Sequence, residues 1–108
     1  MNIFEIADRV KKMSRDFDDS SDHWDAALRD LNYALCDTSD SDVLERCILD
    51  DESWELPVDE RFLILRKAKT LGASSVAFLI DYYGFLSAHL DPGIEKDDAD
   101  RGLAEILR

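Results

Sequence analysis

The stretch 76-VAFLIDYYGFLSAHL-90 places apolar side chains on every side of a helix. A helix that is apolar around its whole axis is normally packed among other elements, because an exposed side would leave apolar surface in water. Ser74 or Ser75 precedes the stretch as a candidate N-cap, and Asp91-Pro92-Gly93 follows it as a turn. We therefore expect a central apolar helix at about residues 75–90.

The rest of the chain has the spacing of amphipathic helices, and no segment alternates with a period of two for long enough to indicate a strand. The expected helices cover residues 3–17, the segment from Trp24 to Leu35, a short segment from Val43 to Ile48, a segment from Pro57 to Gly72 with two apolar sides, and a weaker terminal helix interrupted by Gly102. This pattern predicts an all-α fold, a single compact bundle of five or six helices. Stacked helical hairpins are one arrangement compatible with it.

Short polar runs precede the expected helices and can supply their caps. Asn2, followed three residues later by Glu5, has the pattern of a capping box before the first helix. Ser21 or Asp22 would cap the second, and the Asp/Ser run at residues 37–42 leads into the third. A calcium loop is the alternative for such runs, but the glycine and bidentate glutamate that the loop requires are missing at the right spacing. Capping is the preferred interpretation.

Length and composition indicate one domain covering residues 1–108. A hydrophobic content of 45% with 35% charged residues is typical of a compact globular protein. The chain opens without a basic and then apolar leader, and its longest apolar run is far shorter than the ~20 residues needed to cross a bilayer. We expect a cytoplasmic protein.

No residue pattern names a reaction. His23 and His89 lie on different expected helices, no glycine-rich phosphate loop is present, and the basic cluster Arg66, Lys67 and Lys69 fits the last turns of a helix. Cys36 and Cys47 both fall at apolar helical positions, so we expect two buried, reduced thiols, with a disulfide between them as the alternative. The prediction is a protein that is not an enzyme and has no metal, no cofactor and no direct contact with nucleic acid.

The negative charge is concentrated in one segment. The chain has a formal net charge of −12, and residues 16–55 contain 14 acidic side chains opposed only by Arg29 and Arg46. The remaining residues contain equal numbers of acidic and basic side chains, so their net charge is zero. Such asymmetry indicates a basic partner, because a one-signed field speeds the approach of the opposite charge.

Trp54 lies in this acidic segment, in an expected loop between Glu52 and Glu55. Tryptophan is enriched among the residues that dominate protein interfaces, so Trp54 is a candidate anchor; packing over the start of the following helix is an equal alternative. The predicted partner-binding residues are the carboxylates around it and the ring itself: Asp37, Asp40, Asp42, Asp50, Asp51, Glu52, Trp54 and Glu55.

In overall character, the chain resembles the small acidic immunity proteins that bacteria make against their own secreted nuclease toxins. The resemblance lies in size, helical pattern and one-sided carboxylate surface, with no diagnostic motif. It implies a stoichiometric inhibitor that binds over or beside the active site of a basic toxin domain. The alternatives are a helical adaptor or regulatory subunit, and an acidic mimic of nucleic acid.

Overall fold

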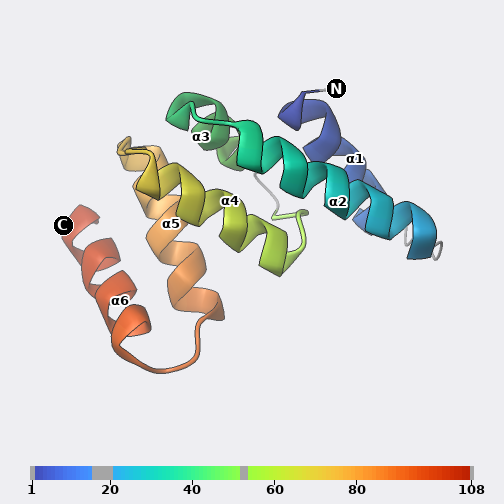
Figure 1. The fold of residues 1–108 in the computed structure, drawn as a ribbon. Coiled ribbons are helices and arrows are strands. Elements are labelled where there is room, and N and C mark those ends of the chain that lie inside the picture. Colours follow the sequence, from blue (N-terminus) through green and yellow to red (C-terminus); the bar gives the residue numbers. More distant parts are fainter. Residues whose placement is uncertain (1, 16–20, 52–53, 108) are drawn as a thin grey trace.

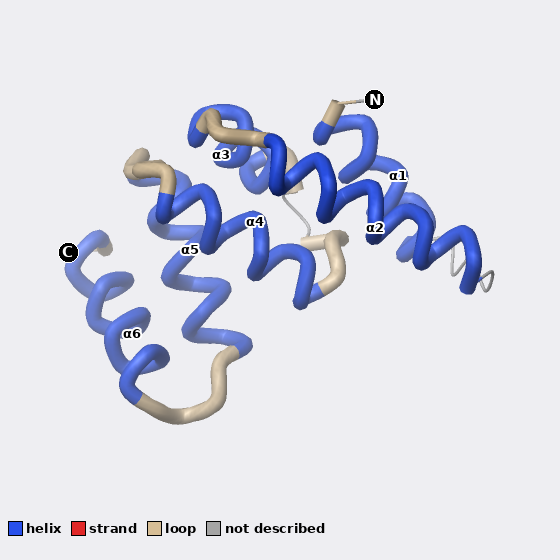
Figure 2. The backbone as a smooth tube through the Cα atoms, in the orientation of Figure 1, coloured by secondary structure: helices blue, strands red, loops and turns tan. Residues whose placement is uncertain are grey.

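The protein is built from helices throughout the described part of the chain. The computed structural model describes residues 2–15, 21–51 and 54–107. Six helices lie in these ranges: α1 Ile3–Arg15, α2 Ser21–Asp37, α3 Ser41–Leu49, α4 Val58–Thr70, α5 Val76–His89 and α6 Ile94–Ile106. Figure 2 shows helices joined by short connections, with no strand in the described ranges. The predicted all-α bundle of five or six helices is confirmed.

The helices form three consecutive hairpins. Helix α1 packs mainly on α2, α3 on α4, and α5 on α6, while α3 also contacts α1 and α5. Figure 1 shows the α1–α2 pair at one end of the molecule and the α5–α6 pair at the other. The molecule is accordingly elongated, with extents of 43 × 28 × 21 Å. Helix α3 therefore connects the two outer pairs.

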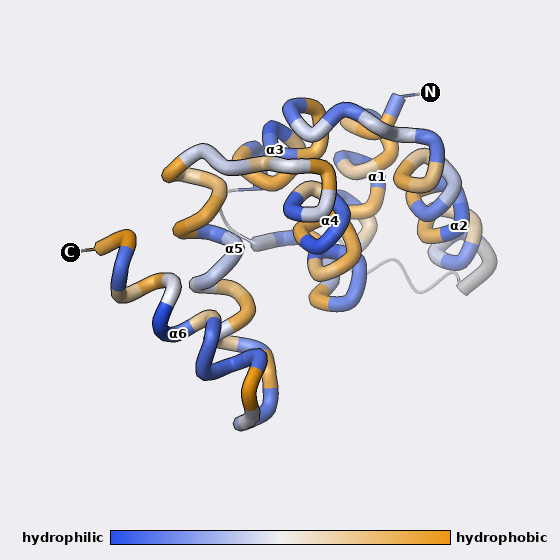
Figure 3. Tube along the Cα trace, turned by 60° about the vertical axis from the view of Figure 1, so that its left-hand side comes forward, coloured by the Kyte–Doolittle hydropathy of each residue, from blue (hydrophilic) through white to orange (hydrophobic). Residues whose placement is uncertain are grey.

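Helix α5 lies between α6 and α4 in Figure 1 and carries the hydrophobic residues that the sequence predicted. Phe78, Phe85 and Leu86 are buried, but Val76 is 64% exposed and Ile80 38% exposed. Figure 3 shows α5 as largely hydrophobic along its length. The helix is thus packed between neighbours and remains open to solvent on one side, because three hairpins in a row do not enclose it.

Helix α4 is less enclosed than expected from its two apolar sides. Its buried face consists of Arg61, Ile64, Leu65 and Ala68, whereas Leu63 is 45% exposed. The spacing of the buried residues is that of one helical face. Phe62 and Leu71 are half-buried against the core, so among these apolar side chains Leu63 is the one that faces solvent.

Most of the predicted caps are present. The side chain of Asn2 accepts a hydrogen bond from the Glu5 N–H at 3.0 Å, and the Asp40 side chain accepts one from the Asp42 N–H at 2.9 Å. Ser75 Oγ caps α5 by accepting from the Phe78 N–H at 3.2 Å. Gly72, just after α4, has φ +101°, a left-handed conformation that favours glycine. The prediction that Ser21 or Asp22 caps the second helix is wrong, because α2 begins at Ser21 and both residues lie within it; the residue before α2 is outside the described ranges.

Helix α6 continues through Gly102, where the sequence predicted an interruption. A Cβ atom at this position would meet the ring of Tyr83 at 2.9 Å, so the glycine allows α5 and α6 to approach closely.

Within the described ranges, no helix is both long and apolar enough to cross a membrane.

Candidate protein-binding surface

Exposed carboxylates gather on α2, on α3 and in the loop between them. We call this set the acidic face; its members are Asp25, Asp30, Asp37, Asp40, Asp42 and Asp50. The two arginines of the segment, Arg29 and Arg46, are also exposed. The structure thus leaves the excess negative charge of these two helices at the surface. Asp16, Asp18, Asp19 and Glu52 lie outside the described residues, as does the side chain of Asp22.

One side of α3 forms a shallow hollow of about 510 Å³ at the acidic face. Asp42, Glu45, Arg46, Leu49 and Asp50 line it from successive turns of the helix, and Ser75 lines it from the position just before α5. Ser75 donates a hydrogen bond to Glu45. The hollow combines the apolar Leu49 with three carboxylates and the single cation Arg46, so its lining is net negative, which suits a basic side chain that carries an apolar stem.

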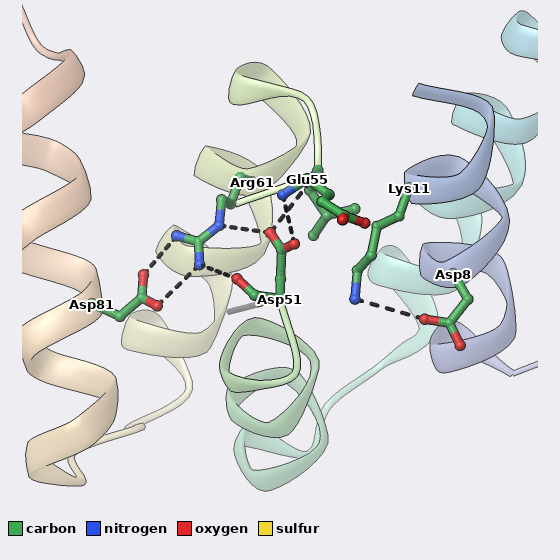
Figure 4. Close-up of polar contacts among 7 residues, drawn as sticks. Asp8, Lys11, Asp51, Glu55, Arg61 and Asp81 are labelled. Carbon is green, nitrogen blue, oxygen red and sulfur yellow. Dashed lines mark hydrogen bonds and ion pairs between the residues drawn. The ribbon is translucent and has the colours of Figure 1, made fainter. Parts of the chain in front are cut away.

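Asp51 does not belong to this surface. The prediction that it contributes an exposed carboxylate is wrong, because its side chain is turned inward and the residue is only 2% exposed. Its carboxylate accepts hydrogen bonds from the N–H groups of Glu55 and Leu56, at 2.8 and 3.3 Å, and from Arg61 Nε at 2.9 Å (Figure 4). These contacts tie Asp51, just after α3, to Glu55 and Leu56, just before α4, and to Arg61 on α4.

Arg61 is fully buried and joins three elements through its guanidinium group. Nη1 and Nη2 donate to the two carboxylate oxygens of Asp81 on α5, at 2.6 and 3.0 Å, while Nε donates to Asp51 (Figure 4). Burial alone would lower the pKa of Arg61, but the hydrogen bonds to Asp81 and Asp51 outweigh it and raise this pKa. The single positive charge of Arg61 is the counter-charge of both carboxylates. Arg61, Asp51 and Asp81 therefore form a structural ion triad.

The sequence analysis missed this triad, although a signal for it exists. Arg61 stands at the first position of the stripe that continues with Ile64, Leu65 and Ala68, where an apolar residue is expected. Asp81 similarly interrupts the apolar stretch of α5. Opposite charges at core positions of two helices predict a buried pair, because a buried charge requires a partner.

Trp54 is both packed and partly exposed. Its ring meets Phe85 edge to face, with 5.0 Å between the ring centroids, and the Arg61 guanidinium lies 5.2 Å from its centroid. The residue has φ +53° and is 41% exposed. The ring therefore covers Arg61 of the ion triad on one side and stays partly exposed on the other; its role as an interface anchor remains a prediction.

The carboxylates predicted to surround Trp54 do not form one ring around it. Asp40 and Asp42 lie at the start of α3, whereas Trp54 follows its end, and nine helical residues separate these ends by about 13 Å. Asp50 and the half-buried Glu55 lie at the Trp54 end. Asp42 and Asp50 instead line one hollow along α3, at opposite ends of the helix.

Two members of the basic cluster of α4, Arg66 and Lys67, make contacts within the protein. Lys67 Nζ donates to the backbone carbonyls of Leu35 and Cys36, the latter at 3.1 Å, and thereby caps the end of α2. Arg66 pairs with Glu95 of α6 at 2.8 Å. These contacts support the assignment of the cluster to helix ends and packing.

The groove between α1 and α2 is a feature that the sequence analysis missed. It has a volume of about 350 Å³ and is lined by Ile6, Asp30, Tyr33, Ala34 and Asp37. Tyr33 is 67% exposed. The sequence could have indicated that Tyr33 is exposed, because this residue lies outside the apolar stripe of α2 that runs through residues 28, 31 and 35.

The two cysteines lie in different environments. Cys47 is buried, but Cys36 is exposed, so the expectation that both are buried is wrong. Both are free thiols. His23 and His89 are on α2 and α5, and no group of three or more histidine, cysteine or acidic side chains is placed to hold a metal in the described ranges.

Cys36 should react rapidly with a thiol reagent in the native protein at neutral pH, whereas Cys47 should react only after unfolding or in strong alkali. Burial raises the pKa of the Cys47 thiol from its ordinary value of 9.0 to about 11, although the charge of Lys11 opposes this shift. The folded state therefore holds this proton more tightly than the unfolded state. The resulting stabilisation is fully present below pH 9.0 and is lost as the pH rises towards about 11.

The measurement is the time course with which the coloured thiolate is released from a chromogenic disulfide reagent. Cys36→Ser is the control, and this substitution should remove the fast phase. Two equally fast thiols in the wild-type protein would contradict the burial of Cys47.

In comparisons with known protein families, curated protein sequences and solved structures, nothing matched this chain.

Proposed function

We propose that this protein binds a basic protein partner through its acidic face and inhibits it, as an immunity protein inhibits a nuclease toxin. The observation that carries the proposal is the segregation of charge. Six exposed carboxylates stand on two consecutive helices and the residues next to them, where Arg29 and Arg46 are the basic residues of the same segment; of the six, Asp30 is paired with Arg9 of α1. Elsewhere, Arg61, Arg66 and Lys67 are engaged with acidic groups or carbonyls of the same chain.

The mechanism follows from the chemistry of phosphate recognition. A nuclease binds its substrate with lysine and arginine side chains, which give its cleft a positive potential. Carboxylates carried on rigid helices can occupy that cleft and compete with the phosphates. Charges that are exposed act over about 8 Å at physiological ionic strength, so the acidic face should mainly accelerate the encounter.

The hollow of α3 suits the close contact. It provides Leu49 for apolar burial between Asp42 and Asp50, and neither carboxylate forms an ion pair with another described residue, although Arg46 also lines the hollow. A standard interface needs about 800 Å² from each partner. The protein exposes 6597 Å² in total, so such an interface would take a modest fraction of it.

The partner can be identified by retrieving proteins from the source cell and by testing basic domains encoded beside the gene. Inhibition of a purified toxin domain at equimolar ratio, with binding weakened by salt, would support the proposal. Retrieval of acidic or neutral partners alone, with no effect of salt, would contradict it. Displacement of a captured DNA-binding protein by DNA, without any toxin, would favour the nucleic-acid mimic.

Replacing Asp42 and Asp50 together by asparagine should slow association with the partner about tenfold at low ionic strength and flatten its salt dependence, because electrostatic steering contributes about 10- to 1,000-fold to such rates. Both side chains are exposed, so the free energy of unfolding should change little. The measurement is stopped-flow association at several salt concentrations.

The matched control replaces Asp91 and Asp97, which are exposed carboxylates outside the acidic face. This pair removes the same charge but should leave the rate nearly unchanged. Equal slowing by both pairs would show that net charge alone acts and that the hollow of α3 is not the docking surface. Asp51 is unsuitable for this test, because its replacement would break the ion triad.

A further inference from the structure

The groove between α1 and α2 combines an apolar floor with an exposed aromatic ring and two carboxylates. Ile6 is buried beneath it and Ala34 is half-buried, while Tyr33, Asp30 and Asp37 stand at its edges. Asp30, Tyr33 and Asp37 are spaced three and four residues apart, so they follow one side of α2. We infer that this groove receives an arginine side chain of the basic partner.

The apolar floor suits the stem of a long basic side chain. Arginine carries three methylene groups below its charged head, and such stems are favourably buried along apolar surface while the head stays near water. The groove volume of about 350 Å³ is ample for one side chain. Ile6 and Ala34 supply the surface for the stem, and the edges supply the polar contacts.

The charges at the edges decide where the guanidinium head would lie. Asp30 already accepts a hydrogen bond from Arg9 at 2.6 Å, so the Arg9 guanidinium occupies the Asp30 end of the groove. Asp37 has no ion pair or side-chain hydrogen bond with any residue in the described ranges. It is the last residue of α2, where the Lys67 ammonium contacts the backbone carbonyls of Leu35 and Cys36 and leaves the Asp37 carboxylate unpaired among the described residues. The Asp37 end is therefore the end that attracts an incoming cation.

Tyr33 gives the site its preference for arginine. It lies one turn before Asp37 on the same side of the helix, so a guanidinium paired with Asp37 can stack on its ring. A planar, weakly hydrated guanidinium stacks on an aromatic ring and pairs with a carboxylate in two-pronged geometry, whereas a lysine ammonium does neither as well. The groove should therefore distinguish arginine from lysine.

This inference rests on the proposed function, because it assigns to the basic partner one contact that the acidic face would make. It adds a second point of contact, apart from the hollow of α3. Tyr33 would act there as the aromatic anchor, a role that the sequence suggested only for Trp54.

The test uses a blocked hexa-arginine peptide and its hexa-lysine counterpart, titrated into the isotopically labelled protein at low ionic strength. Amide resonances of Ile6, Tyr33, Ala34 and Asp37 should shift with hexa-arginine, and hexa-arginine should bind more tightly than hexa-lysine. Tyr33→Ala should weaken hexa-arginine binding about 2- to 5-fold, the range expected for an exposed cation–π contact, and should reduce the difference between the peptides. Asp37→Asn should weaken both peptides.

Asp25→Asn is the matched control, because it removes an equal charge from an exposed position of α2 that does not line the groove. Equal weakening by Asp25→Asn and Asp37→Asn, or shifts confined to α3, would overturn the inference and leave the proposed function intact. Absence of binding by either peptide would also overturn it, while inhibition of the partner tests the proposed function separately. Concentration-dependent shifts at Tyr33 without peptide would assign the groove to a second copy of this chain instead.

Discussion

Replacing Arg61 by methionine should lower the free energy of unfolding by about 3–5 kcal/mol, because the buried carboxylate of Asp51 and the half-buried carboxylate of Asp81 would lose their counter-charge. Methionine retains a long flexible stem, so loss of packing contributes less than loss of charge. The connection between α3 and α4 and its Trp54 ring would lose their support as well. Urea denaturation followed by circular dichroism measures the effect.

Arg66→Met is the matched control on the same helix. Arg66 pairs with Glu95 at 2.8 Å, but both side chains are about half exposed, so the loss should be less than about 1 kcal/mol. Combining Arg61→Met with Asp51→Asn and Asp81→Asn should recover part of the stability, since no buried charge then remains unpaired. Equal losses at the two arginines would contradict the structural role of the ion triad.

Replacing Phe78 by alanine should cost about 3–5 kcal/mol, because the ring is fully buried and its removal leaves a cavity in addition to the lost transfer free energy. Phe78 follows the cap of α5 and packs against Tyr82, with 5.9 Å between the ring centroids. The loss should appear as a lower denaturation midpoint with an unchanged slope, which indicates that the extent of unfolding is the same.

Val76→Ala tests the same helix on its exposed side. Because this side chain stays largely in water, its truncation should change the free energy of unfolding by no more than about 0.5 kcal/mol. Similar losses at the two positions would show that α5 is enclosed on all sides, in conflict with the arrangement in Figure 1.

Helices and caps could be predicted from the sequence because both depend on neighbours within one or two turns. The capping positions at Asn2, Asp40 and Ser75, and the glycine after α4, follow from local backbone chemistry. The extent of burial could not be predicted in the same way. Leu63 and Val76 are apolar helix residues, as Phe78 is, and the sequence does not distinguish them. They nevertheless face solvent, because no neighbouring hairpin covers them.

The candidate binding surface was predicted only in part. Charge segregation identified the exposed Asp37, Asp40, Asp42 and Asp50 as part of one acidic region, because charge is a property of composition. It could not separate Asp50 from Asp51, two adjacent carboxylates of which one is exposed and the other is buried. The burial of Asp51 depends on its ion pair with Arg61, which lies ten residues further along the chain.

The sequence by itself determined the all-α class, the positions of the helices and the location of the excess negative charge, since each depends on residue type and local spacing. Only the tertiary structure decided that Asp51 and Asp81 share Arg61, that Trp54 covers them, and that α1 and α2 leave a groove beside Tyr33. The physical reason is that these features depend on which helix faces meet. Residues distant in the sequence come into contact when the hairpins pack, and the stripe of a single helix does not specify its partner.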